Sequence, residues 1–173
     1  MLVYDYVTTL ATASSLLRIS MTAAFTGVTL RNSIGIRGLV GARNPSPGST
    51  LRVENCTFHA MGVSGVIQAG GGGAVTVLNT IATASNLDFD NNGGMLVQSF
   101  NVSSDATAAG LGSKTMQAPS ALFVSVTAGA EDLHLLSSAM AVDAGSTQSS
   151  FMIDIDGDGR PRGIEWDIGA DEH

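Results

Sequence analysis

Apolar and polar positions along the chain predict short strands that return at a regular interval. Three segments (28–32, 51–55 and 75–79) resemble one another and end in asparagine, and a looser copy, 97–101, ends in Asn101. Each copy has an apolar residue four positions before its asparagine, and the first three have another two positions before it. Side chains alternate between the two faces of a strand, so these residues would share one inward face. No segment carries the apolar spacing of a helix of about ten residues or more.

The interval between the asparagines predicts the fold. Asn32, Asn55, Asn79 and Asn101 are separated by 23, 24 and 22 residues, and a period of this size built from strands and turns is typical of a solenoid. We predict an all-β, right-handed parallel β-helix, a single-stranded solenoid of about five short coils. Asparagine tolerates the left-handed conformation of a corner, and its amide can bond to the asparagines above and below it in a structural ladder. An antiparallel β-sandwich is the alternative, but it gives no reason for the steady interval.

Charge divides the chain into two regions. Of its 173 residues only 13% are charged, and the net charge is −7. Residues 1–130 carry about +1, whereas residues 131–173 hold ten acids and two bases. Stacked strands tolerate like charges in register poorly, so the near-neutral region suits coils. With a single lysine, that region offers little to a phosphate backbone, and we expect no nucleic-acid partner. No apolar run approaches the roughly 18–20 residues of a spanning helix, so we expect no membrane span.

Several phrases of the acidic region follow one another in a recognisable order. They are Leu122-Phe123-Val124, Leu133-His134-Leu135, Ala141-Val142-Asp143-Ala144-Gly145, the segment 154–161 (DIDGDGRP) and the segment 166–172 (WDIGADE). In this order they resemble the ending of secreted bacterial right-handed parallel β-helix repeat proteins, the group called choice-of-anchor Q. The resemblance covers roughly residues 119–172 and implies a pectate-lyase-like solenoid outside the cell or on its surface. Two departures are the proline-free phrase 137–145 and Gly159, where the group commonly has proline.

These observations predict two regions. Coils with a repeat of about 23 residues would occupy 1–119, and a C-terminal cap would occupy 120–173, packed on the last coil. Residues 1–17 have no basic start and their apolar run is broken by Asp5, so they do not resemble a signal peptide. Members of the group are usually longer at the N-terminus. We therefore expect the chain to be the last coils and cap of a longer secreted protein, or the product of a truncated gene of that lineage.

An aspartate-rich loop in the cap has the spacing of a calcium site. Oxygen ligands would come from Asp154, Asp156, Asp158, the backbone carbonyl of Arg160, and Glu165, with Gly159 at the sharp turn. Pro161 departs from the usual loop, no amphipathic helix flanks it, and the two neighbouring arginines can pair with the carboxylates instead. Two interpretations therefore stay open, calcium as the cofactor or a loop that closes the fold, and no other cofactor is expected.

One pair of acids in the coils is a weak catalytic candidate. Asp88 and Asp90 alternate within Leu87-Asp88-Phe89-Asp90, so they would point to the same face of a strand. Parallel β-helix lyases use carboxylate-bound calcium and a basic residue, and glycosidases of this fold use clustered aspartates. No base lies near this pair in sequence, and the alternative is an edge turn leading into Asn91-Asn92-Gly93-Gly94.

Three functions are consistent with the sequence. The first is a non-catalytic extracellular or cell-surface module that binds polysaccharide or another surface glycan in adhesion. The second is a fragment or degenerate relative of a polysaccharide lyase or glycoside hydrolase. The third is an assembly element. Met1-Leu2-Val3 begins in strand-like sequence, and an open edge of the first coil would favour a homo-oligomer.

Overall fold

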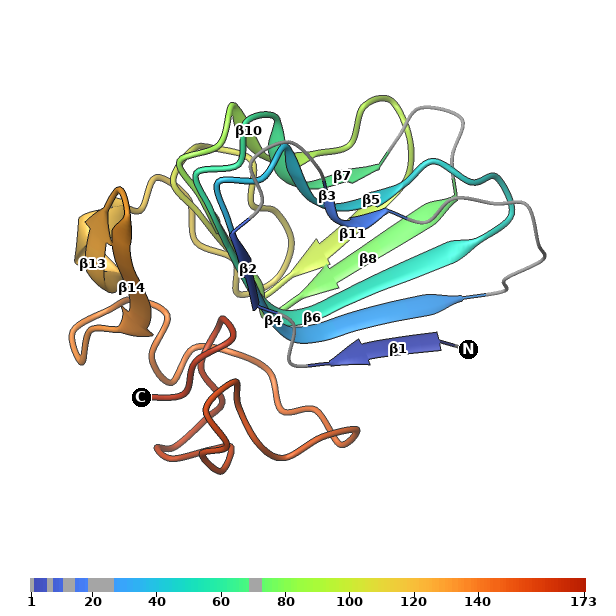
Figure 1. Cartoon of the computed structure of the whole chain (residues 1–173). Helices are drawn as coiled ribbons and strands as arrows, with labels where there is room; N and C mark the ends of the chain where they lie inside the picture. Colours follow the sequence, from blue (N-terminus) through green and yellow to red (C-terminus); the bar gives the residue numbers. More distant parts are fainter. Residues whose placement is uncertain (1, 6–7, 11–14, 19–26, 69–72) are drawn as a thin grey trace.

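The fold is described here from a computed structural model that defines residues 2–5, 8–10, 15–18, 27–68 and 73–173. Nearly all regular structure is β-strand, and the coils are stacked in parallel (Figure 1). The strands of the coils are β1 (Leu2–Asp5), β2 (Thr8–Leu10), β3 (Ser15–Arg18), β4 (Val28–Ile36), β5 (Val40–Asn44), β6 (Thr50–His59), β7 (Ser64–Gln68), β8 (Ala74–Leu78), β9 (Ile81–Thr83), β10 (Leu87–Asp90), β11 (Leu96–Ser99) and β12 (Val102–Ser103). After them come a 3₁₀ turn η1 (Pro119–Ala121) and a hairpin of β13 (Phe123–Thr127) and β14 (Ala130–Leu135).

Three faces make up each coil. The first sheet has the strand order β1-β4-β6-β8-β11, and the second has the order β10-β7-β5-β3. The third face lies beyond the asparagine corner. It consists of β2, the second half of β4, the second half of β6, β9 and β12. All of these pairings are parallel, which confirms the predicted parallel β-helix. The solenoid has about three turns, whereas we predicted about five.

Register in the first sheet confirms the inward face for three of the four copies. Leu30 pairs with Val53, and Val53 pairs with Val77. All three side chains are buried in one apolar core cluster inside the coils. Burying a row of such side chains contributes roughly 1.5–3 kcal/mol for each of them, before the cost of ordering the chain.

The fourth copy departs from the prediction by one residue. Leu96 and Gln98, not Val97, stand in register with the inward-facing Val75 and Val77, and Val97 is 52% exposed. The reason is the corner that follows. In this coil the left-handed residue is Phe100, with φ of 51°, whereas the coils of β4, β6 and β8 place asparagine there. The last coil therefore reaches its corner one residue earlier.

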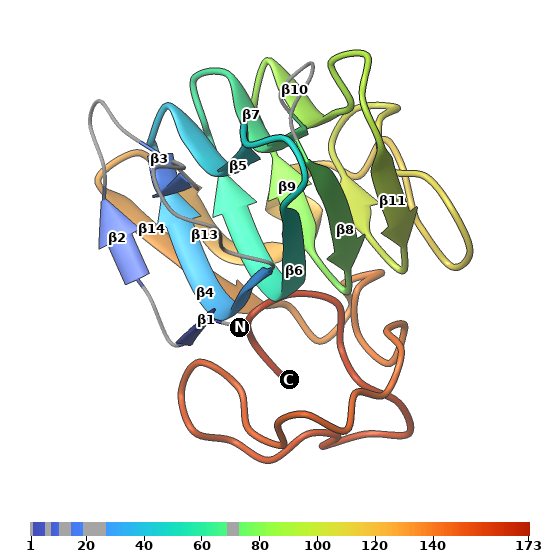
Figure 2. The same cartoon turned by 90° about the vertical axis from the view of Figure 1, so that its right-hand side faces the viewer.

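The hairpin and the residues after it lie beside the coils. Leu122 and Phe123, at the start of β13, share a second apolar cluster with Ile36, Ile81 and Val102 of the third face. Residues 136–173 contain no regular strand and run below the first sheet and its corner (Figures 1 and 2). We expected the cap on the last coil, but it lies along the flank of several coils. The boundary between residues 119 and 120 remains a prediction.

The open-edge hypothesis depends on the first strand. β1 stands at the end of the strand order of the first sheet and pairs with β4. Met1, which the hypothesis also named, lies outside the described residues. Within the described part of the chain, no helix has the length and apolar character needed to cross a membrane.

Candidate functional site

The corner asparagines bind the tail, which we define as residues 136–173. Asn55, Asn79 and Asn32 are fully buried and have φ of 46°, 50° and 44°. Asn79 Nδ2 donates to Asn55 Oδ1 at 3.2 Å, which is one bond of the predicted ladder. Most other side-chain bonds of these residues reach the tail. Asn32 Nδ2 donates to the carbonyl oxygen of Ile153, and Asn55 Nδ2 donates to that of Asp167. Asn79 both donates to and accepts from the backbone of Ser146.

Asn101, the fourth predicted member of the ladder, directs its side-chain bonds to the neighbouring coil. Its Oδ1 accepts from the N–H of Thr80 at 2.9 Å, and its Nδ2 donates to the carbonyl oxygen of Val77 at 3.1 Å. The corner row therefore serves mainly as an anchoring surface for the tail.

Gly169 shows how closely the tail approaches the coils. Its N–H donates to the carbonyl oxygen of Asn79 at 2.9 Å. Its φ is +119°, and a Cβ at this position would lie 2.9 Å from Cδ1 of Ile81. The backbone conformation favours glycine here, and a Cβ would also displace the end of the Ile81 side chain.

Carboxylates hold the irregular backbone of the tail together. Asp154 Oδ1 accepts the N–H groups of Asp156 and Asp158 at 2.9 and 2.8 Å, and its Oδ2 accepts that of Glu172 at 3.0 Å. Other tail acids do the same: Asp143 accepts from Ile164 and Glu165, and Asp167 from Asp143 and His173. Buried N–H groups need acceptors, and these side chains supply what a strand ladder supplies elsewhere.

A buried ion pair lies at the centre of the tail. Arg160 Nη1 and Glu172 Oε2 are 2.6 Å apart, and both side chains are fully buried. The guanidinium also donates to the carbonyl oxygens of Gly169 and Ala170 and lies 5.5 Å from the centre of the Trp166 ring. Burial raises the pKa of Glu172 above its ordinary value, although hydrogen bonds and the arginine oppose this shift.

The predicted calcium ligands have separate roles in the structure. Asp154 is buried, and both of its carboxylate oxygens accept backbone N–H groups. Asp158 pairs with Arg162 at 2.6 Å, and Asp156 lies 3.0 Å from His134. Glu165 is exposed, and the side chain of Arg160 is engaged in the ion pair. This arrangement favours the fold-closing interpretation of the loop, and the calcium hypothesis stays a prediction.

The predicted catalytic pair lies on β10, the strand at one end of the second sheet, as the catalytic hypothesis assumed. Asp88 is fully buried and accepts from the N–H of Ser85, from the N–H and hydroxyl of Ser104, and from the N–H of Asp105. Asp90 accepts from the N–H of Asn92. Burial raises the pKa of Asp88, against the effect of these hydrogen bonds. Asp88 therefore ties β10 to residues 104–105 of the next coil, Asp90 caps the turn that follows β10, and the catalytic hypothesis stays a prediction.

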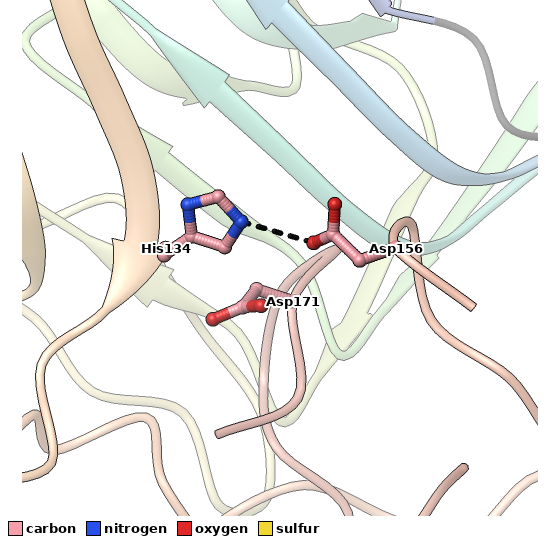
Figure 3. Close-up of side chains that lie close together, drawn as sticks. All are labelled: His134, Asp156 and Asp171. Carbon is pink, nitrogen blue, oxygen red and sulfur yellow. Dashed lines mark hydrogen bonds and ion pairs between the residues drawn. The ribbon is translucent and has the colours of Figure 1, made fainter. Parts of the chain in front are cut away.

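The structure brings together a histidine and two aspartates that the sequence did not combine. One ligand atom from each of His134, Asp156 and Asp171 lies within 4.8 Å of the other two (Figure 3). His134 Nδ1 lies against Asp132 Oδ1 at 2.5 Å, and its Nε2 faces Asp156 Oδ2. The bond to Asp132 raises the pKa of His134, and burial raises the pKa of Asp171. In the part of the chain that the structure describes, this is the one such cluster.

A polar groove lies on the outer face of the first sheet. Its volume is about 290 Å³, and its lining comprises Thr29, Arg31, Arg52, Glu54, Gln148, Ser149 and Ser150. In register, Thr29 of β4 pairs with Arg52 of β6, and Arg31 pairs with Glu54. Arg52 and Glu54 form an ion pair, and Arg31 donates to the carbonyl oxygen of Ser150. The second wall belongs to the tail, so the sequence pattern of the coils alone did not reveal this groove.

Comparisons with protein-family models, curated proteins and solved structures found no match to this chain.

Proposed function

We propose that the chain is a non-catalytic module that binds polysaccharide through the polar groove on β4 and β6. The groove is the observation that carries the proposal. It places two guanidinium groups, a carboxylate, an amide and hydroxyl groups on one surface. Sugars present closely spaced hydroxyl groups, and some carry carboxylates. Side chains of this kind can donate to and accept from both.

The arginines make a chain with uronic-acid units the best candidate ligand. Arg52 is 49% exposed at its side chain even though it pairs with Glu54. Arg31 is held at the tail wall, where its guanidinium lies 4.9 Å from the centre of the Phe151 ring. A guanidinium fixed in this way is ordered before a ligand arrives, which lowers the cost of binding a sugar carboxylate.

A non-catalytic role is supported by the contacts of the candidate acids. The carboxylate of Asp88 is occupied by four hydrogen bonds, one from Ser85 and three from Ser104 and Asp105. Location outside the cell or on its surface, and a role in adhesion, form part of the same proposal. They rest on the resemblance of residues 119–172 to the ending of secreted β-helix proteins.

The test is binding to a panel of acidic and neutral polysaccharides. We expect an acidic polysaccharide to bind the full chain without being shortened, and Arg52→Ala to weaken this binding by about tenfold or more, the value of one charge-assisted hydrogen bond. Lys114→Ala is the charge-matched control. Lys114 does not line the groove, and its backbone pairs with Val102 of β12. Binding that Arg52→Ala leaves unchanged, or no binding to any of the panel, would overturn the proposal. Shortened chains would favour the enzyme alternative.

A further inference from the structure

We infer that His134, Asp156 and Asp171 form a site for a divalent transition-metal ion of the zinc class. The three residues come from three separate segments of the chain. His134 lies on β14, Asp156 lies in the aspartate-rich loop, and Asp171 is near the C-terminus (Figure 3). Their ligand atoms converge within 4.8 Å, which is close enough for one ion to contact all three after small side-chain movements.

The histidine is already oriented for a metal. Asp132, two residues before it on β14, engages Nδ1, so Nε2 faces Asp156. A histidine ligand in a metal site usually donates its second ring N–H to a carboxylate or carbonyl group, which fixes the ring and its tautomer. Asp132 supplies such a partner. The contact between Nε2 and Asp156 Oδ2, at 3.0 Å, is one that a bridging ion would replace.

Asp171 provides the second, independent observation. Asp171 is buried, with an exposed fraction of 7%. Oδ2 accepts the N–H of Leu135 at 2.7 Å, which holds the carboxylate beside β14, the strand that carries His134. Burying a carboxylate costs free energy, and a cation beside it would offset that cost.

The ligand set selects the kind of metal. One imidazole nitrogen and two carboxylates suit zinc and related first-row ions, which take three protein ligands and keep a further position open. Calcium prefers six to eight oxygens. Two cavities of about 370 and 290 Å³ both include His134, Asp156 and Asp171 in their linings, so the fourth position is accessible. A bound ion would connect the β13–β14 hairpin to the tail.

Zinc titration of the chelator-treated full chain tests this inference. We expect one equivalent of zinc to bind in calorimetry and the melting temperature to rise by about 5 °C at saturation. Calcium chloride at the same concentration is expected to produce neither effect. His134→Gln should abolish both effects of zinc, and it should fold because the side chain is 56% exposed.

His173→Gln is the matched control. His173 lines one of the two cavities but does not belong to the three-residue cluster, so zinc binding should persist in this variant. Absence of one-equivalent binding by the unmodified chain would overturn the inference. Zinc binding that His134→Gln leaves intact would also overturn it, because zinc would then bind elsewhere.

Discussion

The coils and the tail satisfy their backbone groups in different ways. In the coils, strands of the first sheet pair in parallel, and the side chains that point inward are apolar. The tail has no strand after β14, and its N–H groups donate to carboxylates such as those of Asp154, Asp143 and Asp167. The comparison explains where the charge lies. Ten acids fall within 131–173 because many of them act as internal hydrogen-bond acceptors for an irregular chain.

The largest expected loss of stability comes from breaking the buried ion pair of the tail, and an exposed ion pair nearby serves for comparison. Arg160→Ala leaves the carboxylate of Glu172 buried without its partner, so we expect a loss of about 3–5 kcal/mol in the free energy of unfolding. Arg162→Ala, two residues away, removes an exposed pair with Asp158 and should cost about 1 kcal/mol or less. Urea denaturation measures both. Equal losses for the two variants would contradict the central role of the buried pair.

The second effect tests the carboxylate as a backbone acceptor. Asp154→Ala removes the acceptor of three N–H groups, and we expect a cost of roughly 2–4 kcal/mol. Asp158→Ala is the control, because its carboxylate is exposed and pairs with Arg162. Thermal or urea unfolding would give the difference. A cost no greater than that of the control would show that Asp154 does not hold the loop.

The third effect concerns the corner of the coils. Asn55→Ala should cost about 2–3 kcal/mol, of which 1–2 kcal/mol reflect the left-handed conformation and the rest the lost amide bonds. Asn55→Gly keeps the conformation accessible and should lose only the bonds. The two variants would be compared in the same unfolding assay. If the two variants were equally destabilised, the left-handed conformation would not account for the larger part of the cost of Asn55→Ala.

The smallest effect is a pH dependence within the coils. His59 is buried against Phe123, and its Nδ1 lies 2.9 Å from the hydroxyl of Thr83. Burial lowers its pKa below 6.5, although the nearby Glu131 and Asp88 oppose the shift and Arg37 adds to it. The unfolded chain therefore binds a proton that the folded chain does not, and stability should fall as the pH drops below about 6.5 towards the folded pKa.

A matched variant isolates this dependence. His59→Gln should flatten the change in the urea midpoint between about pH 7.5 and pH 5, since it removes the group that titrates differently in the two states. An equally steep change in His59→Gln would assign the dependence to other groups.

The coils could be predicted from sequence because their rule is local and repeated. The alternation around Asn32, Asn55 and Asn79 identified both the inward face and the corners. The prediction that Val97 faces inward was wrong for a local reason as well. Phe100, not Asn101, takes the left-handed conformation of that corner, and the residue types do not signal this shift by one position.

The tail could be predicted only in part. Its phrases indicated an ordered ending. Of the two arginines that could pair with the loop carboxylates, Arg162 pairs with Asp158, whereas Arg160 pairs with Glu172 outside the loop. The route of the tail along the corner was not accessible, because it depends on contacts such as that of Asn32 with Ile153, 121 residues apart. For the same reason, neither the metal cluster nor the groove followed from spacing, since each combines segments that are distant in the chain.

Hydrogen exchange at the amide of Ser146 tests most directly that the corner asparagines anchor the tail. This N–H donates to Asn79 Oδ1 at 2.8 Å. Asn79→Gly keeps the corner conformation and removes the acceptor, so exchange at Ser146 should become faster. In Asn101→Gly, whose lost bonds lie within the coils, it should remain as in the unmodified chain. Unchanged exchange at Ser146 in Asn79→Gly would contradict the account.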